Sequence, residues 1–249
     1  MKLGLEGKVA IVTGGSRGIG AAISLELADQ GCSVALTYRG RRDAAEQVAA
    51  KIESMGCRAL ALQADVADTA QTDATVAAVV EKLGGLDILV CNAGITWDGV
   101  IWKMTDEQWD SVLNTNLRGY FTYNRAAARI FKDQRSGKIV NISSINGLRG
   151  KFAQSNYSAS KAGNNALTKA LAKELGKFNV NVNAVAPGMV ATEMAASIPP
   201  EFLNAAVADT VLGRIASSED VAHVVAFLCS EYARHVTGEV IKVDGGQYI

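Results

Sequence analysis

Short runs of apolar, largely β-branched residues recur along the chain, and longer segments with helical periodicity separate them. Several of these runs are apolar almost throughout, which is typical of strands buried on both faces of a parallel sheet. We expect strands at residues 8–12, 33–37, 58–62, 86–91, 138–142, 180–185 and 239–243. We expect helices at residues 18–30, 42–55, 70–83, 106–133, 157–177 and 219–230. This alternation predicts an α/β fold, a doubly wound parallel sheet of about seven strands with helices on both faces.

The alternation continues along the whole chain, without a linker, a low-complexity segment or a second candidate core. We therefore expect residues 1–249 to form a single domain. The longest irregular stretch covers residues 187–213, follows a strand and contains Pro199-Pro200. Long loops at strand ends commonly act as lids, so we expect this segment to cover a substrate site.

The bulk composition excludes several classes of protein. Hydrophobic residues make up 49% of the chain and charged residues 20%, which is enough for a packed core. The formal net charge is +0, so the sequence has no electrostatic footprint of a nucleic-acid or membrane partner. Apolar runs stay shorter than the roughly 18 residues that span a bilayer, and the first residues lack the apolar core of a signal peptide.

The cysteines and histidines favour a cytoplasmic protein without a metal site. The four cysteines are Cys32, Cys57, Cys91 and Cys229. None belongs to a CxxC pair, and we expect reduced, mostly buried thiols, as in cytoplasmic proteins. The two histidines, His223 and His235, lie twelve residues apart and lack zinc-ligand spacing.

A glycine-rich loop, TGGSRGIG at residues 13–20, follows the first expected strand and opens the first expected helix. Glycine tolerates positive φ and lets a diphosphate approach the backbone, while the helix N-terminus offers free N–H groups. A tight turn without a ligand would also use glycines, but the βαβ context favours a dinucleotide loop. The loop residues expected to bind the cofactor are Gly14, Ser16, Arg17, Gly18, Ile19 and Gly20. The domain would then be of Rossmann type and carry both the dinucleotide and catalysis.

Tyr157 and Lys161 lie four residues apart in the segment SNYSASKAG. On a helix both side chains leave the same face, and a nearby cation lowers the pKa of a phenol. Tyr157 could then exchange a proton with a reacting oxygen at neutral pH. Ser144 follows a buried strand thirteen residues upstream and could hold that oxygen. Ser143 is a rival, although the Ser-x-x-Gly spacing to Gly147 favours Ser144.

TGxxxGxG together with Ser144, Tyr157 and Lys161 resembles the short-chain dehydrogenase/reductase family, and the resemblance covers essentially the whole chain. It implies an NAD(P)-dependent oxidoreductase that acts on CH–OH and C=O groups. By this resemblance Tyr157 is the proton donor, Ser144 binds the substrate oxygen, and Lys161 also binds the nicotinamide ribose. Asn116 matches the family's helix asparagine, which holds a water against the lysine in a proton relay. The structural alternative for Asn116 is a local bond to its own helix backbone.

The end of the second expected strand indicates which nicotinamide cofactor binds. NAD-selective family members carry an aspartate there, which accepts hydrogen bonds from the ribose 2′-hydroxyl and repels a 2′-phosphate. This chain has Tyr38 followed by Arg39, and Arg17 lies in the glycine loop. The resemblance assigns the two arginines to the 2′-phosphate, where charge-assisted bonds favour a dianion. We expect NADP(H), against the alternative of two solvated surface arginines.

The same resemblance places further residues at the cofactor. They are Asp65, Val66, Asn92, Ala93, Gly94, Pro187, Gly188, Val190 and Thr192. It implies that Asp65 bonds the adenine and that the segment from Pro187 holds the nicotinamide carboxamide. A helix cap at Asp65 and a plain turn at Pro187-Gly188 are the structural alternatives. Cys91 departs from the family's usual asparagine, which alters either local hydrogen bonding or only packing.

Within the family, the chain most resembles β-ketoacyl thioester reductases. The resemblance rests on NAGIT at 92–96, KMT at 103–105, TNL at 115–117 and VDGG at 243–246. It implies NADPH-dependent reduction of a 3-oxoacyl thioester, carried by acyl carrier protein or CoA, to the 3-hydroxyacyl thioester, as in fatty acid biosynthesis. The substrate residues would be Trp97, Ser144, Gln154 and Tyr157.

Trp97 stands where carrier-protein reductases often have arginine, which keeps other substrates open. Trp97 and Trp102 follow a strand end and could line a site for a cyclic or aromatic ketone, whereas Trp109 fits a packing role. A cofactor-binding subunit without turnover is the remaining alternative, and the intact catalytic set argues against it.

The resemblance also suggests partners. Family members dock acyl carrier protein through basic residues on two long helices; here Arg129 fits one position, while Phe178, beside Lys177, occupies the other. The family is usually tetrameric, and the expected helices at 106–133 and 157–177 carry the apolar faces that a homotetramer needs. The same faces must also cover the sheet.

Overall fold

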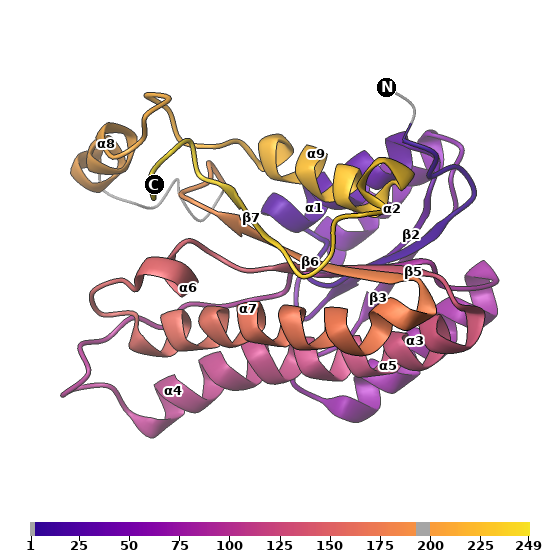
Figure 1. Ribbon diagram of the computed structural model, residues 1–249, viewed down its shortest axis with the longest axis horizontal. Coiled ribbons are helices and arrows are strands. Elements are labelled where there is room, and N and C mark those ends of the chain that lie inside the picture. The colour runs from indigo at the N-terminus through magenta and orange to yellow at the C-terminus, as the bar shows by residue number, and fades with distance from the viewer. Residues whose placement is uncertain (1–2, 193–199) are drawn as a thin grey trace.

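A seven-stranded parallel sheet forms the centre of the computed structural model, which describes residues 3–192 and 200–249 (Figure 1). The strand order is β3-β2-β1-β4-β5-β6-β7, and all neighbouring strands are parallel. The strands are β1 (Val9–Val12), β2 (Ser33–Tyr38), β3 (Ala59–Gln63), β4 (Ile88–Cys91), β5 (Gly137–Ile142), β6 (Val180–Pro187) and β7 (Val240–Val243). The chain winds outward from β1 to β3 and then returns to β4 on the other side of β1, which confirms the predicted doubly wound α/β fold.

Helices connect the strands and cover both faces of the sheet. They are α1 (Gly18–Asp29), α2 (Arg42–Ser54), α3 (Thr69–Leu83), α4 (Asp106–Leu113), α5 (Gly119–Gln134), α6 (Asn146–Arg149), α7 (Ser155–Leu175), α8 (Pro200–Ala208) and α9 (Ser218–Cys229). The shorter turns are the π-helical η1 (Asn114–Arg118) and the 3₁₀-helical η2 (Gly176–Phe178) and η4 (Glu231–Ala233). Helices α1, α2 and α9 lie on one face of the sheet, and α3, α5 and α7 lie on the other (Figure 1).

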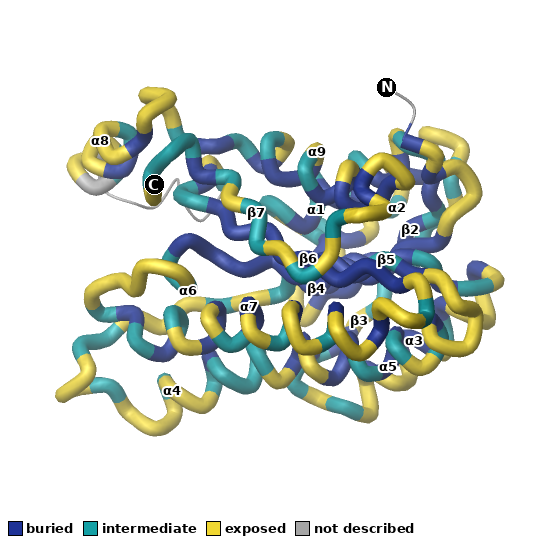
Figure 2. The backbone as a smooth tube through the Cα atoms, viewed as in Figure 1, coloured by how far each residue is buried: buried dark blue, intermediate teal, exposed yellow. Residues whose placement is uncertain are grey.

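Two hydrophobic cores lie on the two faces of the sheet, and Figure 2 shows the buried strands between helices that are exposed on their outer sides. One core packs Ile23 and Leu27 of α1 and Val225 of α9 against the strands. The other packs Tyr123 and Phe131 of α5 against the opposite side. Strands β1, β4 and β6 are buried along their whole length, as the uninterrupted apolar runs of β1 and β4 predict.

The expected helix over 106–133 is interrupted. A capping box at Thr105 starts α4, and the hydrogen-bond register widens to a π-turn at η1 before α5 begins. Apolar periodicity continues through the turn, so the pattern alone predicts one helix. Polar contacts of Asn116 with other segments accompany the change of register.

The segment 187–213 is not irregular throughout, which corrects that expectation, whereas its role as a lid stays a prediction. It contains α8, which begins at Pro200, and proline favours the first position of a helix. Residues 193–199 of the expected lid lie outside the described residues.

Residues 3–192 and 200–249 lack the features of a membrane-spanning helix and of a metal site. No helix in these ranges is long and apolar enough to cross a membrane. No group of three or more histidine, cysteine, aspartate or glutamate side chains in them could hold a metal ion. Three of the four free cysteines are buried, as expected, and Cys57 is half-buried.

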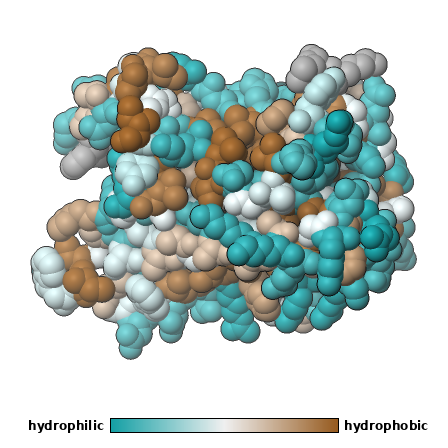
Figure 3. Space-filling model, in the orientation of Figure 1, coloured by the Kyte–Doolittle hydropathy of each residue, from teal (hydrophilic) through white to brown (hydrophobic). Residues whose placement is uncertain are grey.

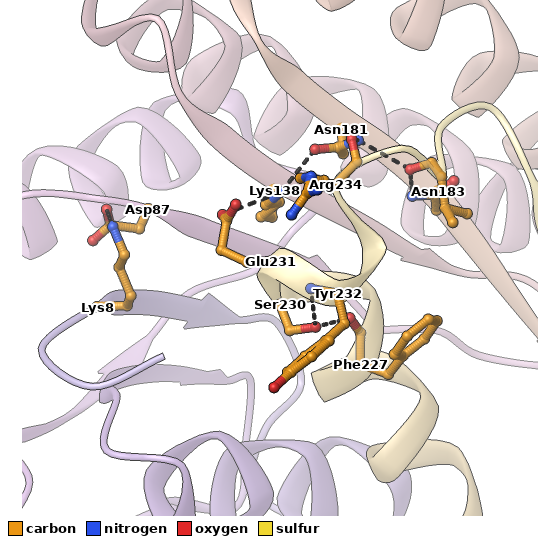
Figure 4. Close-up of polar contacts among 11 residues, drawn as sticks. Lys8, Asp87, Lys138, Asn181, Asn183, Phe227, Ser230, Glu231, Tyr232 and Arg234 are labelled. Carbon is orange, nitrogen blue, oxygen red and sulfur yellow. Dashed lines mark hydrogen bonds and ion pairs between the residues drawn. The ribbon is translucent and has the colours of Figure 1, made fainter. Parts of the chain in front are cut away.

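A network of polar side chains lies at the amino ends of β5 and β6, as Figure 4 shows. Lys138 Nζ donates to Asn181 Oδ1 at 2.7 Å and lies 3.9 Å from a carboxylate oxygen of Glu231. Asn181 Nδ2 donates to the carbonyls of Arg234 at 3.1 Å and Val236 at 3.0 Å. The network fastens the segment after α9 to the sheet, at the end opposite to the site described next.

Candidate active site

A cavity of about 680 Å³ lies at the carboxyl ends of the strands, where the strand order switches between β1 and β4. Figure 3 shows the surface hollowed at this end of the molecule. Every residue that the sequence assigns to the cofactor lines the cavity. They are Gly14, Ser16, Arg17, Gly18, Ile19, Gly20, Tyr38, Arg39, Asp65, Val66, Asn92, Ala93, Gly94, Tyr157, Lys161, Pro187, Gly188, Val190 and Thr192. Ser144 lines the same cavity, so the expected oxygen-binding residue lies among the expected cofactor residues.

The glycine loop is shaped for close approach of a ligand to the backbone. Gly14 and Gly18 have positive φ angles of 64° and 52°. A Cβ on Gly20 would lie 2.2 Å from the carbonyl oxygen of Gly14, so only glycine fits there. Helix α1 has no side-chain N-cap bond and no acidic residue in its first turn. Its first N–H groups and positive dipole end are therefore free to bind a diphosphate.

Thr13 is a residue of the loop that the sequence interpretation did not single out. Its hydroxyl accepts hydrogen bonds from the backbone N–H groups of Asn92 at 2.9 Å and Ala93 at 3.1 Å. Asn92 Nδ2 donates in turn to the carbonyls of Thr13 at 3.0 Å and Gly14 at 3.1 Å. Asn92 thus fastens the glycine loop to the end of β4. The threonine directly before the first loop glycine is the signal that could have revealed this link.

Three arginines, Arg17, Arg39 and Arg41, line the cavity. Arg41 was not singled out, although it belongs to the basic run that follows β2. Arg39 Nη1 lies 3.9 Å from Asp65 Oδ2, and both side chains are more than a third exposed, so this ion pair is weak. A phosphate dianion could engage the same guanidinium groups with charge-assisted hydrogen bonds.

Asp65 does not cap a helix, which was the structural alternative to a role at the cofactor. Its Oδ1 accepts a hydrogen bond from the N–H of Ala67 at 2.9 Å. The cap of α3 is Asp68, which accepts from Ala70 and Gln71. The Asp65 carboxylate therefore stays beside the cavity, next to Arg39.

Lys161 is the buried cation of the site, with 3% of its surface exposed. Its Nζ donates to the carbonyl of Ile142 at 2.7 Å and to the hydroxyl of Tyr120 at 3.2 Å. These partners are neutral, so burial dominates and lowers the pKa of Lys161 to about 7. An amine of this pKa can both hold and release a proton at neutral pH. Tyr120 was missed in the sequence because it lies 41 residues from Lys161.

Tyr157 lines the cavity, and the centre of its ring lies 5.7 Å from Lys161 Nζ. Withdrawal from water raises the pKa of its phenol, and a hydrogen bond with Ser144 offsets part of that rise. The structure therefore reverses the expected direction, because burial disfavours both the phenolate of Tyr157 and the ammonium of Lys161. Tyr157 remains a protonated phenol at neutral pH, which is the state that a proton donor needs.

The two neighbouring serines have different partners. Ser144 Oγ accepts from the N–H of Asn146 at 3.1 Å. Ser143 Oγ donates to the backbone carbonyl of Lys161 at 3.2 Å and so ties β5 to α7. Ser144 is therefore the serine whose hydroxyl can hold a substrate oxygen beside Tyr157.

Asn116 is fully buried in η1 and lies behind the cavity wall. Its Oδ1 accepts from the N–H of Ile95 at 2.8 Å, and its Nδ2 donates to the Ile95 carbonyl at 2.9 Å and to Ser160 Oγ at 3.3 Å. A Cβ added to Gly94 would lie 3.3 Å from Asn116 Oδ1 and 3.6 Å from Lys161 Nζ. Asn116 thus bonds to the segment after β4 through its side chain, which does not fit the alternative of a purely local bond.

The expected substrate residues Trp97 and Gln154 lie outside the residues that line the cavity. Gln154 Nε2 donates to both carboxylate oxygens of Asp98, at 3.1 and 3.0 Å, and its Oε1 accepts from Asn146 at 3.1 Å. The side chain thereby links the loops that contain Asp98 and Asn146, and its contact with the substrate stays a prediction. Trp97 is 41% exposed at the edge of the site.

The other tryptophans do not pack in the core. Trp102 is 73% exposed, and Phe152 on the neighbouring loop is 80% exposed. Trp109 is 39% exposed on α4, which is more than its expected packing role would leave. Cys91 is buried, and Asn124 Nδ2 lies 3.6 Å from its sulfur, so it both packs and accepts a weak hydrogen bond.

Known proteins with similar sequences cover nearly the whole chain. A family model described as enoyl-(acyl carrier protein) reductase matches residues 14–247. The 3-oxoacyl-[acyl-carrier-protein] reductase FabG of Staphylococcus aureus (strain Mu50) is 43% identical over 97% of this chain and 98% of that protein. The acetoacetyl-CoA reductase of Shinella zoogloeoides is 43% identical over the same shares of both chains, 97% and 98%.

A solved structure with a similar fold also covers nearly the whole chain. A protein of Sinorhizobium meliloti 1021, described as a short-chain alcohol dehydrogenase, gives a TM-score of 0.95 and 38% identity. The match covers 99% of this chain and 98% of that one. The sequence relatives and the solved structure therefore all match nearly the whole chain, and all are named as reductases or dehydrogenases.

Proposed function

The chain belongs to the short-chain dehydrogenase/reductase family, and on this premise we propose that it reduces a 3-oxoacyl thioester to the 3-hydroxyacyl thioester with NADPH. Family membership makes it an oxidoreductase that acts on CH–OH or C=O groups. The observation that carries the proposal is that Ser144, Tyr157 and Lys161 line the same cavity, with Tyr157 and the buried Lys161 one turn apart on α7. Relatives named as 3-oxoacyl and acetoacetyl thioester reductases support the substrate class.

The cofactor proposed for the cavity is NADP(H). The loop glycines and the uncapped start of α1 fit a diphosphate. Arg17, Arg39 and Arg41 in the cavity wall fit a 2′-phosphate, and Tyr38 stands where an aspartate would select against it. When bound, the nicotinamide supplies the hydride for the carbonyl carbon.

The side chains of the site bind the substrate oxygen and supply its proton. The hydroxyls of Ser144 and Tyr157 donate hydrogen bonds to the carbonyl oxygen and orient the ketone. Tyr157 transfers its phenolic proton to that oxygen as negative charge develops on it, and the product is the neutral alcohol. Lys161, with a pKa of about 7, then stabilises the phenolate and supplies a proton to restore it.

The proposed macromolecular partners are acyl carrier protein and further copies of this chain. Arg129 of α5 and Lys177 of η2 are both exposed, which suits an acidic carrier. We place the subunit interface of a homotetramer on α5 and α7, because Phe121 of α5 is 46% exposed beside Arg125. Light scattering after size exclusion tests the assembly, and a monomer at micromolar concentration contradicts it.

A second candidate function is the reduction of a cyclic or aromatic ketone. Trp97, Ile101, Trp102 and Phe152 are exposed on the two loops that join at Gly99 and Gln154. These side chains suit a ring-bearing substrate that enters past them. The proposed thioester, by contrast, places only its small ketone group at Ser144 and Tyr157 and does not require these aromatic side chains.

Initial rates with a substrate panel test the proposal. NADPH and NADH oxidation is measured with acetoacetyl-CoA, cyclohexanone and acetophenone. We expect kcat/KM for acetoacetyl-CoA with NADPH to exceed that for either simple ketone by about 100-fold or more. Faster turnover of the ring ketones would favour the second candidate, and NADPH binding without oxidation of any substrate would contradict both.

A further inference from the structure

Two consecutive asparagines, Asn164 and Asn165, lie on α7 in the turn after Lys161. Asn164 is fully buried, and its Nδ2 donates a hydrogen bond of 2.9 Å to the backbone carbonyl of Asn116. The two residues are 48 positions apart, so this bond joins the lysine helix to the π-turn η1. Among the described residues, no donor reaches the Oδ1 atom of Asn164.

This arrangement argues that the amide donor, rather than the packing, is the reason for an asparagine at position 164. A buried polar atom without a partner destabilises the folded state, and leucine, which is larger but branches in a similar way, would carry no such atom. Asparagine supplies what leucine cannot, an N–H group aimed at the carbonyl of the widened turn. π-Helical turns of this kind occur frequently at functional sites.

The neighbouring Gly163 lets α7 and η1 pack closely together. A Cβ at this position would lie 2.9 Å from Leu117 Cδ2. Glycine therefore lets α7 approach η1 closely enough for the Asn164 amide to reach across. Two adjacent residues of α7 thus fit the π-turn, one by its small size and one by its hydrogen bond.

The contacts continue from η1 to the reacting groups. Asn116, whose carbonyl is held by Asn164, uses its side chain to bond both backbone polar groups of Ile95. The adjacent Gly94 lies against both Asn116 Oδ1 and Lys161 Nζ. A shift of the turn would therefore move the wall of the cavity next to the lysine.

We propose that Asn164 is a positioning residue for the reduction: it holds the Asn116 turn, and the Gly94–Ile95 segment bonded to it, in place beside Lys161. The inference rests on the proposed function for its kinetic readout. It acts through Asn116 and does not require Asn164 to touch the substrate or the cofactor.

The test compares Asn164→Leu with a matched control, Asn183→Leu. Asn183 is also buried, and its Nδ2 donates to the carbonyl of Val236 at 2.8 Å, at the opposite end of the sheet (Figure 4). Both variants lose a buried amide, so both should lose thermal stability. We expect Asn164→Leu to lower kcat by about tenfold or more with little change in the KM for acetoacetyl-CoA, and Asn183→Leu to keep kcat within about twofold. Equal kcat losses in the two variants, or an unchanged kcat in folded Asn164→Leu, would overturn the proposal.

Asn164→Asp keeps the shape of the side chain and supplies a test even if the leucine variant does not fold. Burial raises the pKa of the new carboxyl, and its protonated form can donate the same hydrogen bond to Asn116. We expect its kcat relative to wild type to be highest at acidic pH and to fall as the pH rises through the carboxyl pKa. A ratio that does not depend on pH would count against a positioning role.

Amide hydrogen exchange separates failure of this inference from failure of the proposed function, because it needs no substrate. The Ile95 N–H is bonded to Asn116 Oδ1, and its protection depends on the turn. We expect about tenfold faster exchange at Ile95 in Asn164→Leu or Asn164→Asp at neutral pH, with unchanged protection in Asn183→Leu. Unchanged protection of Ile95 would contradict the inference whatever the substrate is.

Discussion

Lys138, which is half-buried, and Lys161, which is buried, lie at opposite ends of the sheet and show how the same side chain serves stability at one end and chemistry at the other. At the amino ends, Lys138 Nζ bonds Asn181 at 2.7 Å and lies 3.9 Å from the Glu231 carboxylate. At the carboxyl ends, the hydrogen-bond partners of Lys161 Nζ among the described residues are the neutral oxygens of Ile142 and Tyr120. Burial lowers the pKa of both lysines, but the coulombic effect of Glu231 opposes the shift for Lys138.

The difference shows what distinguishes a structural polar network from a reactive one. The amino-end network has a carboxylate for its cation and donors or acceptors for its amides. The carboxyl-end cluster buries Tyr157 and Lys161 without a counter-charge, so both charged forms are disfavoured. Such a pair stabilises the fold less and responds more readily to a charge that develops on a bound substrate.

The largest expected effect is the loss of turnover in Tyr157→Phe. Removal of the phenolic proton donor should lower kcat by about 10³-fold, while the Kd for NADPH changes little. Tyr123→Phe is a matched control, because Tyr123 is also a buried tyrosine but lies outside the residues that line the cavity. We expect that control to retain full activity. Substantial turnover by Tyr157→Phe would remove the proposed proton donor.

The next effect is a pH dependence of stability that differs between the two lysines. The folded pKa of Lys161 is about 7, below the ordinary lysine pKa of 10.5 that holds in the unfolded chain. Between these values the unfolded chain binds a proton that the folded chain lacks, so the free energy of unfolding rises with pH. We expect the Tm of the wild type, relative to Lys161→Met, to increase from pH 7 to pH 9.

The corresponding comparison with Lys138→Met should give a smaller slope of the same sign, because Glu231 opposes the lowering of the Lys138 pKa. Thermal unfolding at several pH values measures both slopes. A flat difference for Lys161 would show that this amine stays protonated in the folded protein.

Arg39→Asp should change cofactor preference by a smaller amount. The substitution removes a guanidinium that lines the cavity and adds a carboxylate that repels a 2′-phosphate. We expect the ratio of kcat/KM for NADPH over NADH to fall by about 10-fold to 100-fold, with kcat nearly unchanged. An unaltered ratio would show that Arg39 does not take part in phosphate recognition.

The smallest expected effect comes from Lys8→Ala at the amino end of the sheet. Lys8 Nζ lies 3.1 Å from Asp87 Oδ1, and the two side chains are 46% and 31% exposed. Exposed pairs of this kind contribute less than about 1 kcal/mol, so the Tm should fall only slightly and kcat should not change. A clear loss of activity would mean that the two ends of the sheet are coupled.

Local patterns in the sequence are sufficient for much of the fold and for part of the site. Apolar runs predict the seven strands, and the spacing of Tyr157 and Lys161 predicts their common face on α7. The glycine loop is equally local, since its positive φ angles follow from its own residues. Proline at position 200 could have indicated the start of α8.

Contacts between distant segments explain what the sequence could not reveal. The π-turn at Asn116 depends on Asn164 and Ile95, each in another part of the chain. The pKa values of Tyr157 and Lys161 depend on burial, which the four-residue spacing does not specify. Spacing therefore predicts which groups meet, and packing decides which protonation state they keep.

Transfer of deuterium from NADPH labelled at the hydride position tests the central claim most directly. Wild-type protein is incubated with labelled NADPH and acetoacetyl-CoA, and the product is examined by mass spectrometry. The account predicts 3-hydroxybutyryl-CoA with deuterium at C3 from the wild type, and almost none from Tyr157→Phe at equal cofactor occupancy. Product without the label, or the same labelled product from Tyr157→Phe, would contradict the proposed reduction at this site.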